Sequence, residues 1–272
     1  MGYRGFTLVE LLVVIVVLCL LIGLFLSVLE KARERSRALQ CSTNLHHLTM
    51  CLKMYETDHN AYPYAFDSLT HGMKPPPTGY AGKPTYDRMG WWWFDCLSNS
   101  IEKQISEQPI YRCPSRIIGD RGVKENILWG NYGVNRSVCK SLTGKLEHEE
   151  FIGSSLAMDQ ISQPSRTLLV FDCGYSMATW RHVTDEPPQP FGKAIEDNAY
   201  IPGLWINKKR TFRSFQEYDA LVGRHFDKSI NAGFTDGHIE RLKADKLCVK
   251  KCEDNKYRNL CPLWRPQKSI NN

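Results

Sequence analysis

Four side chains in one short stretch of the sequence are of types that bind metal ions. His225, Asp227, Asp236 and His238 offer imidazole nitrogens and carboxylate oxygens close together along the chain. Calcium takes about six to eight oxygen ligands, which is more than this group supplies. The alternative interpretation is that Asp236 forms a turn and that the histidines make hydrogen bonds at the edge of a sheet. We therefore expect no metal ion and no other cofactor at these residues.

The sequence lacks the common motifs of catalysis. It contains no G-x-S-x-G, no phosphate-binding P-loop and no G-x-G-x-x-G. The stretch His148-Glu149-Glu150 lacks the second histidine of the zinc-protease motif H-E-x-x-H. We therefore expect a protein that is not an enzyme.

Cysteines are the third group with chemistry of their own. Cys19 lies in an apolar run, and the other nine would form disulfides if the body of the protein is exported to an oxidising compartment. Cys41 and Cys51 cannot pair with each other, because ten residues of helix separate them by about 15 Å. The three cysteines of the C-terminal tail form a weak zinc signal without a fourth ligand nearby. The candidates for disulfides are Cys41, Cys51, Cys96, Cys113, Cys139, Cys173, Cys248, Cys252 and Cys261. Because their number is odd, at least one thiol stays free or bridges two chains.

Residues 11–29 carry no charge, and no comparable run follows them. At about 1.5 Å per residue they match a hydrocarbon layer roughly 30 Å thick, so they predict one membrane span. The run is too long for a secretory signal peptide, and no small-residue cleavage site follows it. Glu10 stands at its start, where a carboxylate costs roughly 2.5–3.5 kcal/mol, which suggests a partner or a function for it.

The residues around Glu10 carry a resemblance. The sequence GFTLVE at residues 5–10, directly before the apolar run, resembles the type IV prepilin cleavage and methylation motif of pilins and type II secretion pseudopilins. The resemblance implies cleavage by prepilin peptidase between Gly5 and Phe6, followed by N-methylation of Phe6. It also implies a single-pass protein of the inner membrane, with a short cytoplasmic N-terminus and an exported body. The basic residues after the span favour the opposite orientation, and we give the resemblance precedence.

Cleavage would give Glu10 a partner, because it creates a cationic amine on Phe6. Opposite charges attract more strongly in hydrocarbon than in water, although both must lose their hydration. In these families the amine of a neighbouring subunit is the usual partner, which makes Glu10 an assembly residue. The alternative is a pair within one chain, since Phe6 and Glu10 are four residues apart on a helix.

The helix is predicted to continue beyond the membrane. Apolar residues recur at alternating steps of four and three and form one stripe. These residues are Cys41, Leu45, Leu48, Leu52 and Tyr55. Pro63 ends the pattern, so we expect one helix of some fifty residues whose second half packs on a sheet.

The remaining chain reads as an α+β body with long loops. The best buried strand is TLLVFD at residues 167–172, and WWWFDCL at residues 91–97 predicts a short helix running towards residue 105. Residues 74–84 and 185–192 read as loops. The predicted fold class is pilin-like α+β, with a long N-terminal helix packed on an antiparallel sheet. The predicted segments are a leader at 1–5, the membrane half of the helix at 6–29, its amphipathic half at 30–58, the body at 59–242 and a basic cysteine-containing tail at 243–272.

A β-hairpin is predicted at residues 230–242. Asp236-Gly237 lies between two alternating arms and is typical of a two-residue type I′ turn. That register places Thr235 opposite His238 and Phe234 opposite Ile239.

The hairpin carries a second resemblance. His225 followed by Asp236, Gly237 and His238 is similar to the C-terminal H-X9-DG element of a large bacterial family of prepilin-type proteins. Other segments similar to that family are the helix end with Cys41, YETDHNAYP, YRCPS at residues 111–115, NYGVN at residues 131–135 and PSRTLLVFD. Here ten residues, not nine, separate His225 from Asp236, so a role that depends on His–Asp geometry is not carried over.

Two features have more than one interpretation. WWWF at residues 91–94 is expected in the core or at a subunit contact, and the alternative is a surface that stacks on sugars. Residues 241–272 hold nine Lys/Arg and three Asp/Glu, which equals the net charge of +6 of the whole chain. We expect a solvated tail, with a contact to an anionic polymer or a neighbouring subunit as the alternative, and we predict no nucleic-acid partner.

The sequence therefore predicts a structural subunit of a type IV pilus-like filament or a type II secretion pseudopilus. Its expected partners are prepilin peptidase, other pilin-like subunits and the membrane. The alternative is a surface binding module for carbohydrate or another polymer that uses the same anchor.

Overall fold

One helix dominates the molecule. The computed structural model describes residues 7–67, 90–97, 109–118, 126–142, 149–185, 199–206, 212 and 214–266. Helix α1 spans Leu8–His59 without a break and ends at Asn60, whose φ of 56° is left-handed. Asn tolerates this conformation better than most residues, and Pro63 lies three positions beyond. The predicted helix of some fifty residues is confirmed.

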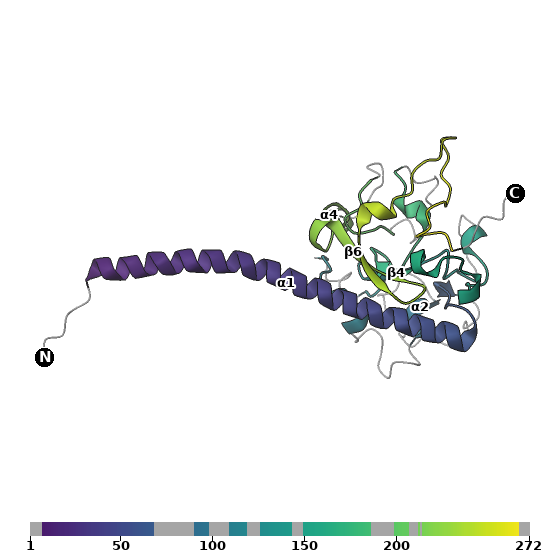
Figure 1. The fold of residues 1–272 in the computed structure, drawn as a ribbon, viewed down its shortest axis with the longest axis horizontal. Coiled ribbons are helices and arrows are strands. Elements are labelled where there is room, and N and C mark those ends of the chain that lie inside the picture. Colours follow the sequence, from purple (N-terminus) through teal and green to yellow (C-terminus); the bar gives the residue numbers. More distant parts are fainter. Residues whose placement is uncertain are drawn as a thin grey trace.

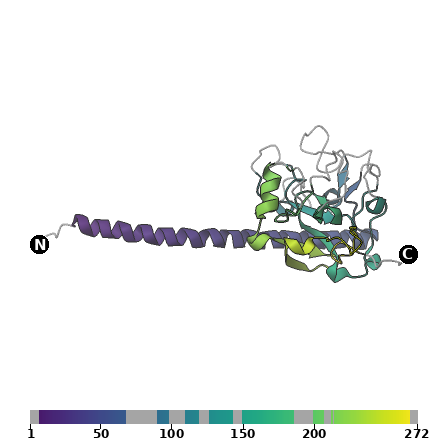
Figure 2. The same ribbon diagram turned by 90° about the horizontal axis from the view of Figure 1, so that it is seen from above.

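The two halves of α1 have different surroundings. Its first half projects beyond the rest of the molecule and curves gently (Figure 1), and its apolar side chains there are exposed. The body lies against the second half only, as the view from above also shows (Figure 2). Cys41, Leu45, Leu48 and Leu52 are 0% exposed, which confirms the predicted stripe.

A five-stranded sheet forms the centre of the body. Its strands are β3 (Tyr132–Asn135), β4 (Leu168–Asp172), β5 (Met177–Ala178), β6 (Ser229–Phe234) and β7 (Ile239–Lys243). They run in the order β5-β3-β4-β6-β7, and every pair is antiparallel except β3 with β5. Helix α1 packs mainly on β6 and β4. The predicted α+β class with a long helix on an antiparallel sheet is confirmed, with one short parallel pair added at the edge.

Short elements surround this sheet. Strand β1 (Phe66–Asp67) pairs with β2 (Trp91–Trp92), which leads into α2 (Trp93–Cys96), and α4 spans Ser214–Val222. Single 3-10 turns occur at Pro109–Tyr111, Glu149–Phe151, Met158–Gln160, Pro164–Arg166, Trp180–Val183, Phe226–Lys228 and Ala244–Leu247.

The tryptophan-rich segment differs from its predicted form. Trp91 and Trp92 are a strand, and the helix begins only at Trp93. Its predicted continuation to residue 105 lies outside the described residues, as does the loop predicted at 74–84 and all of the loop predicted at 185–192 except Asp185. Trp92, Trp93 and Phe94 are each 1% exposed, so the core interpretation is correct for them and the sugar-stacking one is wrong.

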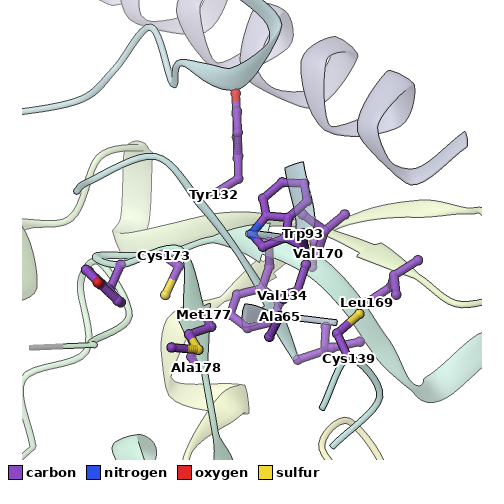
Figure 3. Packing of buried hydrophobic residues seen from close by; sticks show 14 of the residues in the cluster. Ala65, Trp93, Tyr132, Val134, Cys139, Leu169, Val170, Cys173, Met177 and Ala178 are labelled. Carbon is purple, nitrogen blue, oxygen red and sulfur yellow. The ribbon is translucent and has the colours of Figure 1, made fainter. Parts of the chain in front are cut away.

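The core joins β1, α2 and the sheet. Figure 3 shows Trp93 beside Val170 and Val134, with Ala65 close by. The indole Nε1 of Trp93 donates a hydrogen bond to the Ser176 carbonyl at 2.8 Å. The polar atom of this buried side chain is therefore satisfied. All five residues of β4 are buried, as predicted for that segment.

The hairpin register differs by one residue from the prediction. Gly233 pairs with Ile239, and the Phe234 N–H donates to the His238 carbonyl at 3.0 Å. The loop therefore has three residues, with Gly237 N–H bonded to the Phe234 carbonyl and Gly237 at φ 104°. Asp236 is not among the residues of positive φ, which a type I′ turn would require. The predicted two-residue turn is wrong, and Phe234 stacks on His238 instead, with ring centroids 4.2 Å apart.

The described part of the C-terminal tail packs on the body. Trp264 is 0% exposed, meets Phe171 edge-on at 5.4 Å and donates from Nε1 to the Leu247 carbonyl at 2.9 Å. The carbonyl of Leu263 accepts from the Leu168 backbone at the start of β4. The described tail is therefore attached to the body through Trp264, while most of its basic side chains are exposed, as expected of a solvated tail.

Candidate functional site

Glu10 closes the N-terminus of α1. Thr7 is the N-cap, and its hydroxyl accepts from the Glu10 backbone at 3.2 Å. Carboxylate oxygen Oε2 of Glu10 accepts in turn from the backbone N–H and the hydroxyl of Thr7, both at 2.8 Å. This reciprocal arrangement is a capping box, which satisfies helix N–H groups that have no partner within the helix. The predicted processing residues Gly5 and Phe6 lie outside the described residues.

Helix α1 is long and apolar enough to cross a bilayer. An 18-residue window within it has a mean hydropathy of 3.4, and none of that window is buried against the described body. It is the one candidate span found in the described part of the chain. Glu10 therefore stands at the N-terminal edge of an apolar surface that the described residues do not cover.

A second cluster lies in the interior, where four elements meet. It comprises Cys41, Cys113, Asp172 and His225, whose sulfur, oxygen and nitrogen atoms all lie within 4.8 Å of one another. Cys41 belongs to the apolar stripe of α1, and Cys113 follows the 3-10 turn Pro109–Tyr111. Asp172 is the last residue of β4, and His225 precedes β6. Each side chain is at most 4% exposed.

The distances within the cluster are short. The two sulfurs are 3.8 Å apart, and Sγ of Cys41 lies 3.1 Å from Oδ1 of Asp172. The other carboxylate oxygen, Oδ2, lies 3.2 Å from Nε2 of His225 and accepts from the Asn231 backbone at 2.7 Å. Tyr132 closes one side, since its hydroxyl donates to Sγ of Cys41 at 3.5 Å. Figure 3 shows the ring of Tyr132 extending away from the group around Val134 and Trp93.

Electrostatics divide the cluster into charged and neutral partners. Burial alone would lower the pKa of His225, but hydrogen bonds to Asp172 and Cys113 raise it to about 10. Burial likewise opposes the charge of Cys113, yet hydrogen bonds from Cys41 and His225 and the nearby charge of Arg224 lower its pKa to about 6. The pKa of Cys41 is raised by burial and by its bond to Cys113. Burial would raise the pKa of Asp172, but the bond and charge of His225 hold it below its usual value. These contacts favour the charged forms of His225, Asp172 and Cys113 and the neutral form of Cys41.

Further groups hold His225 and its neighbour in place. Nδ1 of His225 lies 3.3 Å from Oε1 of Glu34 on α1, and the same oxygen accepts from the Ser115 hydroxyl at 3.0 Å. The amide nitrogen of Asn231 is 3.2 Å from Nε2 of His225. Arg224 is buried beside them and forms a two-pronged ion pair with Asp219, its shortest contact being 2.6 Å.

The four residues first considered for a metal do not come together. Asp236 and His238 pair at 2.6 Å across the hairpin turn, where the side chain of His238 is 40% exposed. Asp227 stands in a 3-10 turn with φ 57°. His225 lies in the interior cluster and not with the other three. The available signal was different: Cys41, Cys113, Asp172 and His225 each lie in a segment that carried the resemblance to the prepilin-type family.

The ten cysteines, all of which lie in described residues, have free thiols. The predicted disulfides therefore remain predictions. A cysteine next to a histidine is also the arrangement of a cysteine nucleophile, but both side chains are at most 4% exposed here. The cluster suits an internal structural role.

A long N-terminal helix whose apolar first half is exposed and whose second half packs on an antiparallel sheet matches a pilin-like fold. A family profile described as "Prokaryotic N-terminal methylation motif" matches residues 1–26. A second profile, described as "Protein of unknown function (DUF1559)", matches residues 30–171, more than half of the chain, and the chain belongs to this family. No curated protein and no solved structure gives a match.

Proposed function

We propose that this chain is a non-enzymatic structural subunit of a pilus-like or pseudopilus filament. Prepilin peptidase would cut it between Gly5 and Phe6 and methylate the new amine of Phe6. The observation that supports this most strongly is the methylation motif at residues 1–26, directly before a helix whose apolar half has no cover in the described chain. Such a helix needs either lipid or other helices around it.

Glu10 is the proposed assembly residue. Its Oε2 atom is occupied by Thr7, whereas its Oε1 atom has no hydrogen-bond partner among the described residues. A carboxylate accepts several hydrogen bonds, so the capping box and an incoming amine are compatible. The cap also fixes where the carboxylate lies, which reduces the entropy lost when the methylated Phe6 amine of a neighbouring subunit binds.

The proposed location follows from the same features. The chain crosses the inner membrane once, with its short N-terminus in the cytoplasm and its body outside. In the filament, the apolar halves of α1 from many subunits would form the central bundle, and the bodies would lie on its outside.

The mature N-terminus tests the processing step. The full-length protein is purified from cells with and without prepilin peptidase, and its N-terminal peptide is analysed by mass spectrometry. We expect a chain that begins at methylated Phe6 in the first cells and at an uncut leader in the second. An uncut chain in both would remove the proposal.

Assembly is tested separately with Glu10→Gln. Glu30→Gln is the matched control, because both carboxylates lie on α1 but only Glu10 borders the methylation site. We expect Glu10→Gln to be cleaved normally yet to be lost from the sheared filament fraction, while the control still assembles. Equal filament yield from both variants would contradict the role of Glu10.

The alternative of a carbohydrate-binding module loses its main support. Three of the four aromatic residues in WWWF are buried in the core, so they do not form a stacking surface. We therefore favour the structural subunit.

A further inference from the structure

We propose that Cys41, Cys113, Asp172 and His225 bind one divalent zinc ion in the interior of the body. Zinc binds cysteine thiolates, histidine nitrogens and carboxylate oxygens, and its structural sites are closed sets of four ligands. This inference departs from the expectation of no metal and places the site at a different set of residues from the one first considered. It does not depend on whether the chain assembles into filaments.

The spacing of the four ligand atoms fits a tetrahedral ion. Two thiolates about 2.3 Å from zinc stand about 3.8 Å apart in tetrahedral geometry, and the sulfurs of Cys41 and Cys113 are 3.8 Å apart. An imidazole nitrogen and a carboxylate oxygen would stand about 3.4 Å apart, and Nε2 of His225 is 3.2 Å from Oδ2 of Asp172. Asp172 would bind through Oδ2, and its other oxygen Oδ1, which lies 3.1 Å from Sγ of Cys41, would not be a ligand.

The surroundings of the cluster also fit a metal site. Ligating histidines usually give their second ring nitrogen to a carboxylate, which sets the tautomer and the ring orientation. Nδ1 of His225 lies 3.3 Å from Oε1 of Glu34, which leaves Nε2 as the ring nitrogen on the side of Asp172. Glu34 itself is held by Ser115 at 3.0 Å. Arg224 is paired with Asp219 but lies close enough to favour a negative charge on Cys113 as well.

A disulfide between Cys41 and Cys113 is the competing arrangement. It would require the sulfurs to approach from 3.8 Å to about 2.05 Å. It would leave the pair of Asp172 and His225, 3.2 Å apart, outside the new bond. Zinc uses all four side chains, whereas the disulfide uses two.

The proposed ion would have a structural effect. Its ligands come from α1, from the segment after Pro109–Tyr111, from the end of β4 and from the segment before β6. One ion would therefore connect the long helix to three parts of the body. Because the ligands are far apart in sequence, they meet only in the folded chain, and binding is coupled to folding.

The test measures metal in the full-length chain, purified in detergent under reducing conditions without chelator. Elemental analysis by mass spectrometry should find one zinc per chain. We expect that zinc to be lost from Cys113→Ala and His225→Ala. Cys139→Ala is the matched control, because Cys139 is also 0% exposed but lies outside the cluster, and it should keep the ion.

A second measurement covers the case in which a ligand variant fails to fold. Cobalt(II) added to the wild-type chain after zinc removal should give the visible bands of a tetrahedral ion and a thiolate-to-cobalt charge-transfer band. Glu34→Gln leaves all four ligands in place and should weaken metal affinity about 10–100-fold. Simultaneous replacement of Cys248, Cys252 and Cys261 by serine should leave the cobalt spectrum unchanged.

Three outcomes would overturn the proposal. One is a metal-free wild-type chain that also fails to take up cobalt. Another is a Cys41–Cys113 disulfide found by peptide mass spectrometry in the chain as isolated from cells. The third is zinc that persists in folded Cys113→Ala and disappears when the three tail cysteines are replaced.

Discussion

Gly233 of β6 lies directly beneath Thr49 of α1. A Cβ atom on Gly233 would stand 2.2 Å from Oγ1 of Thr49, and that hydroxyl is already held by the Leu45 carbonyl at 2.8 Å. Helix α1 and strand β6 are therefore so close here that no side chain fits at position 233. This contact lies on the surface where α1 docks on the sheet.

Gly233→Ala should accordingly lower the free energy of unfolding by about 1–3 kcal/mol, because the added methyl group overfills a packed site. Denaturant unfolding of the full-length chain in detergent, followed by tryptophan fluorescence, measures the loss. Thr49→Ala removes the hydroxyl that the methyl group would meet. The double variant should recover part of the loss, and strictly additive losses would show that the two residues do not share the space.

The buried stripe of α1 makes a second prediction. Leu48 is 0% exposed and Leu39 is 70% exposed on the same helix. Leu48→Ala should cost about 2–5 kcal/mol through lost burial and the cavity it leaves. Leu39→Ala should stay within about 0.5 kcal/mol of the wild type. Similar losses in the same unfolding measurement would mean that α1 does not dock on this stripe.

The third prediction concerns the hairpin turn. Gly237 has φ 104°, and a Cβ there would stand 2.9 Å from Cε of Met50. Gly153 has a similar φ of 114° with nothing within 4 Å. Gly153→Ala should therefore show the backbone strain alone, about 1–3 kcal/mol, and Gly237→Ala should lose more because it also displaces Met50. An equal loss in both variants would show that the contact between the turn and α1 does not contribute to the free energy of unfolding.

The buried ion pair makes a fourth. Arg224 and Asp219 have side chains that are 0% and 1% exposed, so Arg224→Met would leave a buried carboxylate without its cation. The expected loss is about 3–5 kcal/mol, and adding Asp219→Leu should restore part of it. Arg181, whose pair with Glu150 is partly exposed, is the control, and Arg181→Met should cost no more than about 1 kcal/mol.

The features predicted correctly from the sequence are those that depend on neighbouring residues. The stripe from Cys41 to Leu52 follows from helix periodicity, and β4 follows from a short run of apolar residues. The first pattern reflects burial of one face of an element and the second reflects burial of both faces. In each case the order of apolar residues along the chain shows it directly.

The hairpin turn could not be predicted in this way because distant residues hold it. Lys53 donates to the Asp236 carbonyl at 2.5 Å, and the hydroxyl of Tyr62 donates to the Thr235 carbonyl at 3.2 Å. Thr235 N–H also bonds to the Thr167 carbonyl at 3.0 Å. These contacts to α1, the segment after it and the start of β4 favour a three-residue loop over the one that Asp-Gly alone predicts.

The cysteine, aspartate and histidine cluster was missed for a related reason. Its members come from four elements, and no fixed spacing joins them along the chain. The first metal hypothesis grouped His225 with Asp227, Asp236 and His238. These four are close in sequence, but a turn and strand β6 separate His225 from Asp236 and His238. Proximity along the chain was a poor guide because β6 carries the hairpin away from His225.

The unbroken course of α1 has a geometric consequence for any polymer of this chain. Because α1 is unbroken, a rotation of its first half about the helix axis turns the body by the same angle. The orientation of the first half therefore sets the direction in which the body points. Advancing one subunit by a single residue along its own helical screw, so that each side chain takes the place of the next one, would turn the body by about 100° and shift it by about 1.5 Å. If a charged pair near the N-terminus of α1 fixed the axial position of each subunit, it would also fix the orientation of the bodies around the polymer, at the far end of a 52-residue helix.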